Sequence, residues 1–316
     1  MSDVKLFRIA ADGAASELPS SGVALEKSLQ NLIEHNLEQF LGVRFLASEH
    51  STGKVHGGRI DTLGIDENNL PVIIEYKRAT NENVVNQGLF YLDWLMDHQG
   101  DFQLLVQENL GQEIANALVW SAPRLICIAG EFTKFDEHAV KQMGRNIELI
   151  RYRRYGDELL LLELVNATSA TDKPSSPRQI FGETREVHGK ARTYKTISVD
   201  LEEADKELLD LYESLKAHLE ALGDDVQTKT LQYYIAFKRI KNFACVEFRN
   251  QKGHLLVFVK VDPDADEVVD LMVNEGFLRD VRGIGHYGTG DLEITIRNQK
   301  DLERAKPLLA QSYNSA

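Results

Sequence analysis

The sequence predicts an α/β domain with a mixed sheet, followed by a smaller α+β domain. With 316 residues the chain exceeds the usual size of one domain. In its first half, β-type runs such as RLICIAG and IELIRYRR alternate with helical stretches, which is typical of an α/β domain. Residues 166–195 are rich in Thr, Ser, Pro, Lys and Glu, a composition typical of a linker. We therefore expect domains at residues 1–165 and 196–316, joined by a linker at residues 166–195.

The first domain opens with a helical pattern. From Val23 to Leu41 apolar residues recur at steps of three and four, and Gly42 follows as a stop signal. Helical spacing resumes from Val84 to Trp94. The apolar run FQLLVQ, at residues 102–107, is predicted to be a further strand.

The second domain is expected to mix helices and strands. Helical patterns cover residues 201–222, 231–237 and 299–311. The runs FACVEF and HLLVFVKV, on either side of an Asn-Gln-Lys-Gly turn, read as strands.

The stretch GRIDTLGIDENNLPVIIEYKR, residues 58–78, carries charge where a sheet should be apolar. Arg59–Ile65 and Pro71–Lys77 alternate with period two around a turn-rich segment, which predicts a hairpin. If residues 67–69 form a three-residue loop, Ile65 faces Pro71 and Asp61 faces Glu75.

This register places Asp61, Glu75 and Lys77 on one face of the hairpin. Carboxylates directly across a ladder have Cβ atoms about 4.5–5.5 Å apart and repel each other. A divalent cation between them would remove the repulsion. The alternative is a structural cluster of ion pairs at a sheet edge.

The neighbouring helices supply further polar candidates. Glu26 lies at the border of an apolar stripe, so its carboxylate either leans toward the hairpin or is a solvated first-turn acid favoured by the helix dipole. Gln87 and Tyr91 are four residues apart and share a helix face. They are either surface residues or hydrogen-bond partners of a carboxylate or phosphate.

Composition limits the classes of function. The formal net charge of −13 argues against a broad electrostatic grip on nucleic acid but leaves room for a local basic groove. The apolar runs are too short to span a bilayer, and no signal-peptide pattern opens the chain, so we expect no membrane partner and a cytoplasmic protein. Cys127 and Cys245 lie in apolar runs and are expected to be core thiols.

Three other groups of residues have more than one interpretation. The candidate phosphate contacts Arg151, Arg153 and Arg154 could instead be charges on a solvated edge strand. His50 and His56 are metal ligands, proton carriers or ordinary loop histidines. The glycine-rich run of residues 279–291 is either a ligand loop or a tight turn; its candidate ligand residues are His286, Tyr287 and Asp291.

The ordered set of helix Glu26, strand Asp61, Glu75-Tyr76-Lys77 and Gln87-x-x-x-Tyr91 resembles the PD-(D/E)xK nuclease superfamily, in particular its RecB-like and NucS-like members. The resemblance covers roughly residues 23–165 and implies a restriction-endonuclease-like core. Ile60 stands before Asp61, so the Pro-Asp dipeptide that names the superfamily is absent. The resemblance implies a catalytic set of Glu26, Asp61, Glu75, Lys77, Gln87 and Tyr91.

Phosphodiester hydrolysis through this set would use Mg²⁺ or Mn²⁺, since Mg²⁺ prefers oxygen ligands and is typically held by one or two carboxylates. Asp61 and Glu75 fit that count, with the Tyr76 carbonyl and Glu26 as further ligands. Lys77 would orient the attacking water or counter transition-state charge. Arg59 and Arg78, at the ends of the hairpin, are further candidate contacts to nucleic acid.

Residues 196–316 resemble a family of C-terminal domains of unknown function, through YYIAFK, NFACVEF and RDVRGIGHYGTGDLEITI. Some of its members are labelled predicted transport proteins, a role that the lack of a membrane-spanning run argues against.

The leading functional hypothesis is a Mg²⁺-dependent nuclease acting on DNA, including branched, mismatched or foreign DNA. The second domain would supply substrate choice or homodimerisation. The alternatives are a nucleic-acid-binding module without turnover and a protein-interaction module, each retaining the nuclease fold.

Overall fold

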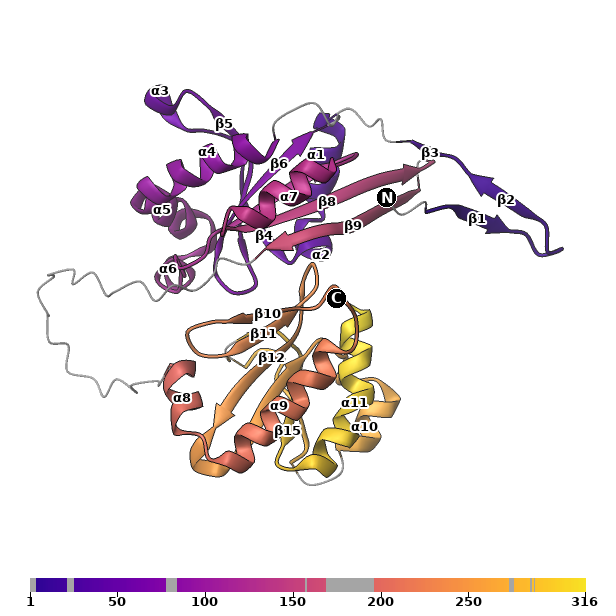
Figure 1. The fold of residues 1–316 in the computed structure, drawn as a ribbon, viewed down its shortest axis with the longest axis vertical. Coiled ribbons are helices and arrows are strands. Elements are labelled where there is room, and N and C mark those ends of the chain that lie inside the picture. Colours follow the sequence, from indigo (N-terminus) through magenta and orange to yellow (C-terminus); the bar gives the residue numbers. More distant parts are fainter. Residues whose placement is uncertain are drawn as a thin grey trace, which may run out of the picture. The chain divides into compact units, whose positions relative to one another are not determined.

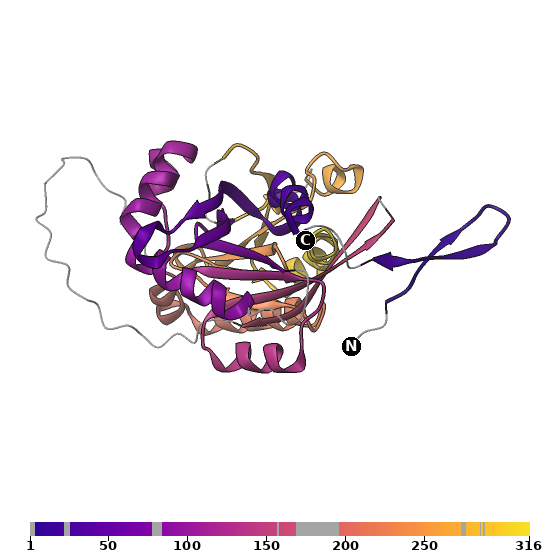
Figure 2. The same ribbon diagram turned by 90° about the horizontal axis from the view of Figure 1, so that it is seen from above.

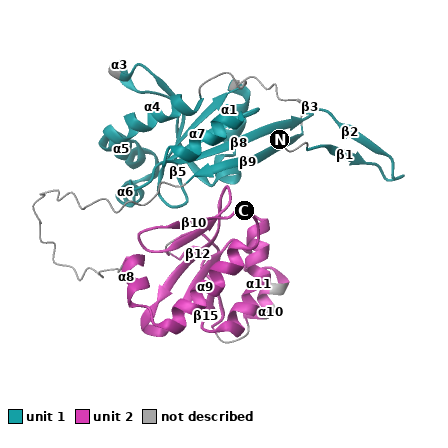
Figure 3. Ribbon diagram, viewed as in Figure 1, with its two compact units in different colours: residues 1–171 teal, residues 172–316 magenta. Residues whose placement is uncertain are grey.

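The computed structural model describes residues 4–21, 26–77, 84–156, 158–168, 196–272, 276–284, 286 and 288–316. At a few of these positions, Glu26 among them, only the backbone is described. The chain divides into two compact units, residues 1–171 and 172–316 (Figure 3). The predicted linker lies, from residue 169 onward, outside the described residues. An α/β domain with a mixed sheet followed by a smaller α+β domain, the predicted class, is confirmed.

Unit 1 is built on a mixed sheet with strand order β3-β8-β7-β6-β5-β4, in which β9 also pairs with β8 (Figure 1). Strand β5 pairs antiparallel with both β4 and β6, whereas β7 pairs in parallel with both β6 and β8. The strands are β3 (Ser20–Ser21), β4 (Val43–Ser51), β5 (Arg59–Asp66), β6 (Pro71–Lys77), β7 (Arg124–Ala129), β8 (Asn146–Tyr155) and β9 (Leu159–Thr168). The predicted hairpin is therefore β5–β6, inside the sheet.

A separate hairpin of β1 (Leu6–Ile9) and β2 (Ala15–Leu18) projects away from the rest of unit 1 in both views (Figures 1 and 2). The helices of unit 1 pack against the strands of the main sheet or connect them along the chain. They are α1 (Glu26–His35), α2 (Leu37–Leu41), α3 (Gly53–His56), α4 (Val84–Asp97), α5 (Gln99–Leu110), α6 (Gln112–Asn116) and α7 (Lys134–Gln142).

The helices α1 and α4 hold opposite faces of the β5–β6 hairpin. Helix α4 contributes Val84, Leu92 and Leu95 to a buried cluster with side chains of one sheet face. On the other face, the Thr62 hydroxyl donates to the Glu34 carboxylate of α1 at 2.6 Å. The hairpin thus has a helix against each of its faces, from upstream and downstream in the chain.

Two predicted elements of unit 1 differ from the structure. The helix expected over residues 23–41 is split into α1 and α2 at Asn36, whose side chain donates to the Leu32 carbonyl at 2.9 Å. Gly42 ends α2 in the left-handed region (φ 63°), as the stop signal predicts. The strand predicted for residues 102–107 is wrong, because these residues lie in α5 with Phe102 and Val106 buried four residues apart. A short apolar run fits both periods.

Unit 2 has an antiparallel sheet with order β10-β11-β12-β13-β15-β14. Its strands are β10 (Gln227–Thr230), β11 (Ile235–Lys238), β12 (Asn242–Arg249), β13 (His254–Val259), β14 (Leu278–Asp280) and β15 (Leu292–Ile296). Its helices are α8 (Ile197–Glu203), α9 (Lys206–Glu220), the 3₁₀ turn η1 (Asn250–Lys252), α10 (Asp266–Met272) and α11 (Gln299–Asn314).

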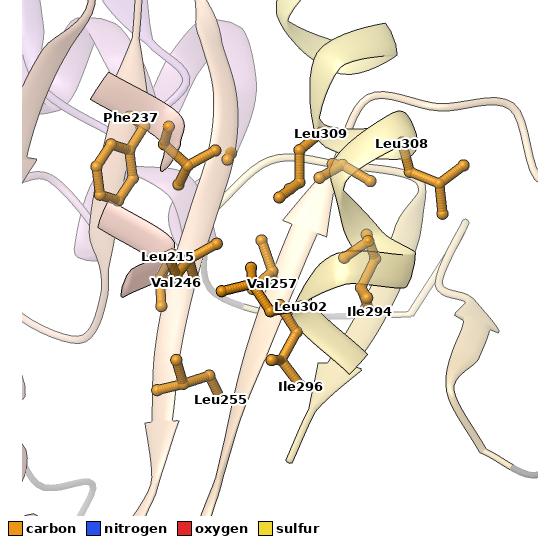
Figure 4. Packing of buried hydrophobic residues seen from close by; sticks show 14 of the residues in the cluster. Leu215, Phe237, Val246, Leu255, Val257, Ile294, Ile296, Leu302, Leu308 and Leu309 are labelled. Atoms are coloured by element: carbon orange, nitrogen blue, oxygen red, sulfur yellow. The ribbon is translucent and has the colours of Figure 1, made fainter. Parts of the chain in front are cut away.

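Helices of unit 2 cover one face of its sheet. Leu215 of α9 and Leu302 of α11 pack on Val246, Val257 and other strand side chains in one buried cluster (Figure 4). The helix predicted over residues 231–237 is wrong, since this stretch leads into β11. There Ile235 and Phe237 enter that cluster while Ala236 points to a second one, which is strand alternation.

Two expectations from composition can be compared with the structure. Cys127 and Cys245 are buried free thiols, as predicted. Across the described ranges, no helix combines the length and the apolar character that crossing a bilayer requires.

Candidate active site

The β5–β6 hairpin has the predicted register. Ile65 pairs with Pro71, and the ladder continues to Thr62 opposite Ile74. The Asp66 N–H donates to the Leu70 carbonyl at 2.9 Å, which closes a three-residue loop. The Asp66 carboxylate also accepts the Leu70 N–H at 2.9 Å. The ladder ends at that pair, and Asp61 and Glu75 are the next residues of the two strands.

Hydrogen bonds join these two acids directly. The Asp61 N–H donates to Oε1 of Glu75 at 3.2 Å, and the Tyr76 N–H donates to Oδ2 of Asp61 at 3.0 Å. Each carboxylate is therefore oriented by the backbone of the opposite strand. Both side chains lie at the same end of the hairpin and on the same sheet face.

Glu75 is buried without its full set of hydrogen bonds. Its side chain is 0% exposed, and its Oε2 has no hydrogen-bond partner among the residues that the structure describes. Burial, followed by the nearby Asp61 carboxylate, raises the pKa of Glu75 to about 9, although the charge of Lys77 acts in the opposite direction. The acid is thus held neutral near pH 7 unless a cation stabilises its ionised form.

The donors at this position suit a hard divalent cation. Asp61 and Glu75 supply carboxylate oxygens, and the carbonyl of Tyr76 follows directly on β6. Among the side chains that the structure describes, no group of three or more His, Cys, Asp and Glu could hold a metal ion. Glu26 begins α1, but its side chain lies outside the described part. Lys77 ends β6 on the face of Glu75 and is half-buried.

Gln30 of α1, which sequence reasoning missed, supports Asp61 from the helix side. Its buried Nε2 lies 2.8 Å from the Asp61 carbonyl and 2.9 Å from the Glu34 carboxylate. The Ser48 hydroxyl of β4 lies 3.1 Å from the same nitrogen. A polar residue between Leu29 and Ile33, four positions after Glu26, was the available signal.

Gln87 and Tyr91 of α4 meet the start of β5, as their shared helix face suggested. The Tyr91 hydroxyl accepts the Arg59 N–H at 3.1 Å and lies 3.4 Å from Nε2 of Gln87. A Cβ atom at Gly58 would fall 2.5 Å from the Tyr91 ring, so only glycine fits there. Helix α4 therefore fixes the backbone two residues before Asp61.

The predicted nucleic-acid contacts do not form one surface. Arg151 is buried and pairs with Glu163 at 3.4 Å, and Arg153 pairs with Glu131 at 3.8 Å. Strand alternation turns Arg154 to the opposite sheet face. The edge-strand alternative for these arginines is wrong, because β8 has β7 and β9 on its two sides.

Of the two arginines at the ends of the hairpin, the structure describes only Arg59. Arg59 is exposed, with its guanidinium 3.5 Å from the Glu49 carboxylate. Arg78 lies outside the described residues.

A buried ion cluster, also missed from the sequence, lies at the loop end of the hairpin. Arg124 of β7 contacts Asp66 at 3.0 Å and both oxygens of Glu148 at 3.0 and 2.8 Å. All three side chains are almost fully buried. This cluster is at the other end of β5 from Asp61, so its role is structural.

Aromatic rings surround the two candidate histidines of unit 1. The His56 ring lies 5.3 Å from Phe90, and the His50 ring lies 5.4 Å from Trp94. Burial lowers the pKa of His50. His98 stacks on Trp94 at 4.8 Å. The spacing of Phe90, Trp94 and His98, four residues apart on α4, was a signal that sequence reasoning overlooked.

The glycine-rich run of unit 2 packs as a turn. His286 stacks on Phe258 with centroids 4.4 Å apart, and the exposed Asp291 donates its N–H to the Val259 carbonyl at 3.0 Å. Gly288 has φ +84°, and a Cβ there would fall 2.5 Å from Cβ of Cys245. Tyr287 lies outside the described residues. These contacts favour the turn over the ligand loop.

Fold and site together define a two-unit α/β protein with a carboxylate pair in its first sheet, of which Glu75 is buried and Asp61 half-buried. The chain belongs to the same family as an uncharacterized protein of Haemophilus influenzae (strain ATCC 51907 / DSM 11121 / KW20 / Rd). The two are 31% identical over 307 residues, which cover 95% of this chain and 96% of the relative. Residues 198–316 match the family model described as "Domain of unknown function (DUF5655)".

Two solved structures show limited similarity. The crystal structure of a repair endonuclease from Pyrococcus abyssi is 21% identical, covers 41% of this chain and 48% of its own, and has a TM-score of 0.28. A structure of an EndoMS–dsDNA complex is 21% identical, covers 41% of this chain and 46% of its own, and has a TM-score of 0.24. The match thus spans about half the length of each of those chains.

Proposed function

We propose that unit 1 is a Mg²⁺- or Mn²⁺-dependent nuclease that hydrolyses phosphodiester bonds in DNA. The observation that carries the proposal is the buried Glu75 carboxylate, which lies beside Asp61 and has one oxygen without a hydrogen-bond partner in the described part of the chain. Burying an ionised acid in this way costs free energy that the Asp61 N–H and the charge of Lys77 offset only in part, since the pKa of Glu75 stays raised. A divalent cation held by the two carboxylates would offset the remainder.

The residues at this end of the hairpin have different roles in the proposed reaction. Asp61 and Glu75 hold the cation, and the Tyr76 carbonyl and Glu26 offer further oxygens. A bound Mg²⁺ supplies Lewis-acid stabilisation of charge on the phosphate oxygens. Lys77, on the face of Glu75, orients the attacking water and counters the same negative charge.

Gln87 and Tyr91 position the start of β5 rather than reacting themselves. The Tyr91 hydroxyl holds the Arg59 N–H, and Gln87 approaches that hydroxyl. Near-attack geometry depends on sub-ångström placement of the reacting groups, so this anchor supports catalysis through Asp61.

A cleavage panel tests the proposal. The full chain is incubated with Mg²⁺ or Mn²⁺ and with single-stranded, duplex, flap, mismatched and branched DNA. We expect cleavage of at least one substrate, loss of cleavage on adding EDTA, and loss in Lys77→Ala. Lys134→Ala, an exposed lysine on α7, is the matched control and should cleave as the unmodified chain does.

Two outcomes would count against the nuclease. Lys77→Ala cleaving at the unmodified rate would remove the assigned site. DNA binding without metal uptake or cleavage on every substrate would instead support a binding module without turnover. The part assigned to unit 2, substrate choice or homodimerisation, is tested by sedimentation of the full chain with and without DNA.

A further inference from the structure

An open depression of about 640 Å³ lies at the start of β5 and is lined by residues of α3 and α4. It shares residues with the site, because Tyr91 lines it together with Arg59, which stands two positions before Asp61 on β5. Gln87 also lines it. A ligand in the depression would therefore lie next to the strand that carries the first carboxylate.

Two glycines form the floor of the depression and leave its backbone accessible to a ligand. Gly53 and Gly57 line it, and a Cβ atom added at either would meet nothing within 4 Å. Lys54 and Arg59 line it as well and are exposed. Two cations beside uncovered backbone suit a strand of phosphates better than an apolar ligand.

Aromatic rings stand beside this floor. Phe90 is 45% exposed, and its ring lies 5.3 Å from His56 and 5.8 Å from Tyr91. His56 stands between Lys54 and Gly57, which both line the depression. A lone exposed phenylalanine needs no explanation. Here, however, the ring joins a row that continues through His56 to His98 at 5.8 Å, next to two cations.

We propose that a DNA strand with an unpaired nucleobase binds here, with the base stacked on Phe90 and His56 beside the depression and the adjoining phosphates in the depression on Lys54 and Arg59. The inference rests on the proposed nuclease function and specifies its substrate as DNA with unpaired bases next to the cut. Stacking of bases on aromatic side chains tolerates any sequence, because every base has a π face. The bases inside a duplex keep their faces covered by neighbouring bases.

Binding is measured by fluorescence anisotropy with the full chain carrying Lys77→Ala, so that Mg²⁺ is present without cleavage. The probes are a short adenine-rich DNA single strand, the same strand with abasic sites throughout, and a blunt duplex. Phe90→Ala is compared with Phe90→Tyr, which keeps a ring, and with Phe135→Ala, which removes a 73% exposed phenylalanine from α7.

We expect Phe90→Ala to weaken binding of the adenine-rich strand by about fivefold or more, from the usual cost of losing one base stack. Phe90→Tyr and Phe135→Ala should bind within about twofold of the parent, because neither substitution removes a ring that stacks on a base. On the abasic strand and the duplex, Phe90→Ala should bind as the parent does.

Equal loss on the abasic strand would overturn the stacking site, as would an unchanged affinity of Phe90→Ala for the adenine-rich strand. Cleavage by the chain with native Lys77 is scored separately. Cleavage without Phe90-dependent binding leaves the nuclease standing and removes this subsite. Phe90-dependent binding without cleavage on any substrate removes the nuclease and keeps the base-binding site.

Discussion

The backbone N–H of Asp61 donates a hydrogen bond to Oε1 of Glu75 at 3.2 Å, whereas Oε2 accepts none from any residue within the described ranges. In return, the Asp61 carboxylate accepts the Tyr76 N–H at 3.0 Å. Backbone N–H groups of the two strands thus fix the orientation of both carboxylates. This reciprocal arrangement makes the protonation of Glu75 the first property to test.

The free energy of unfolding in EDTA should fall as pH rises from about 4.5 toward about 9. Burial raises the pKa of Glu75 from 4.5 to about 9, so over this window the folded chain holds a proton that the unfolded chain has released. One such group contributes at most about 1.4 kcal/mol per pH unit. Urea unfolding at several pH values compares the unmodified chain with Glu75→Gln. The free energy of unfolding should fall less with rising pH in the variant, because its amide does not titrate; equal slopes in the two proteins would contradict the prediction.

Gln30→Leu should lower both stability and activity. The substitution leaves the half-buried Asp61 carbonyl and Glu34 carboxylate without this donor, at a cost of about 1–3 kcal/mol. Displacement of Asp61 should reduce the apparent Mg²⁺ affinity in the cleavage assay by about tenfold, as for other residues that orient ligands. Gln112→Leu, at an exposed position of α6, is the control and should change neither quantity.

Arg124→Met should destabilise unit 1 strongly. It leaves Asp66 and Glu148 buried without their cation, and breaking a buried ion cluster in this way costs about 3–5 kcal/mol. Denaturant unfolding of the full chain measures the loss. Because the cluster lies at the loop end of the hairpin, the protein that remains folded at low temperature should still cleave. A loss confined to activity, with stability unchanged, would show that Arg124 acts in the site.

Gly288→Ala tests the turn in unit 2. The residue has φ +84°, and a methyl group would press on Cys245, so we expect unfolding of unit 2 at lower denaturant. Gly283→Ala shares the positive φ, at +69°, but meets nothing within 4 Å. It should cost only about 1 kcal/mol from the backbone conformation. Equal effects of the two substitutions would argue that packing on Cys245 is unimportant.

Sequence reasoning succeeded where the contacts are short-range. The pairing of Ile65 with Pro71 follows from loop length and alternation, and the approach of Gln87 to Tyr91 follows from helical spacing. It failed for Gln30 and Arg124, whose partners lie 31 and 58 residues away in the chain. Those contacts exist only once the elements have packed. Helical spacing marks Gln30 as a polar residue beside an apolar stripe, but it does not identify the partner.

The wrong elements have a common cause. Residues 102–107 and 231–237 are short apolar runs, in which helical and strand periods match about equally well. Packing on neighbouring elements decides between them. In α5 the buried residues are Phe102 and Val106, four apart, whereas Ile235 and Phe237, two apart, share a face of β11.

The contact of Gly58 with Tyr91 couples two positions that are 33 residues apart in the chain. Neither residue can change alone: a side chain at position 58 would collide with the ring, and a smaller residue at position 91 would release the Arg59 N–H. We therefore expect the two positions to covary among relatives of this chain. In a relative without tyrosine at position 91, position 58 no longer has to be glycine. Relatives that have changed at both positions would therefore lack the hydrogen bond that anchors the backbone before Asp61.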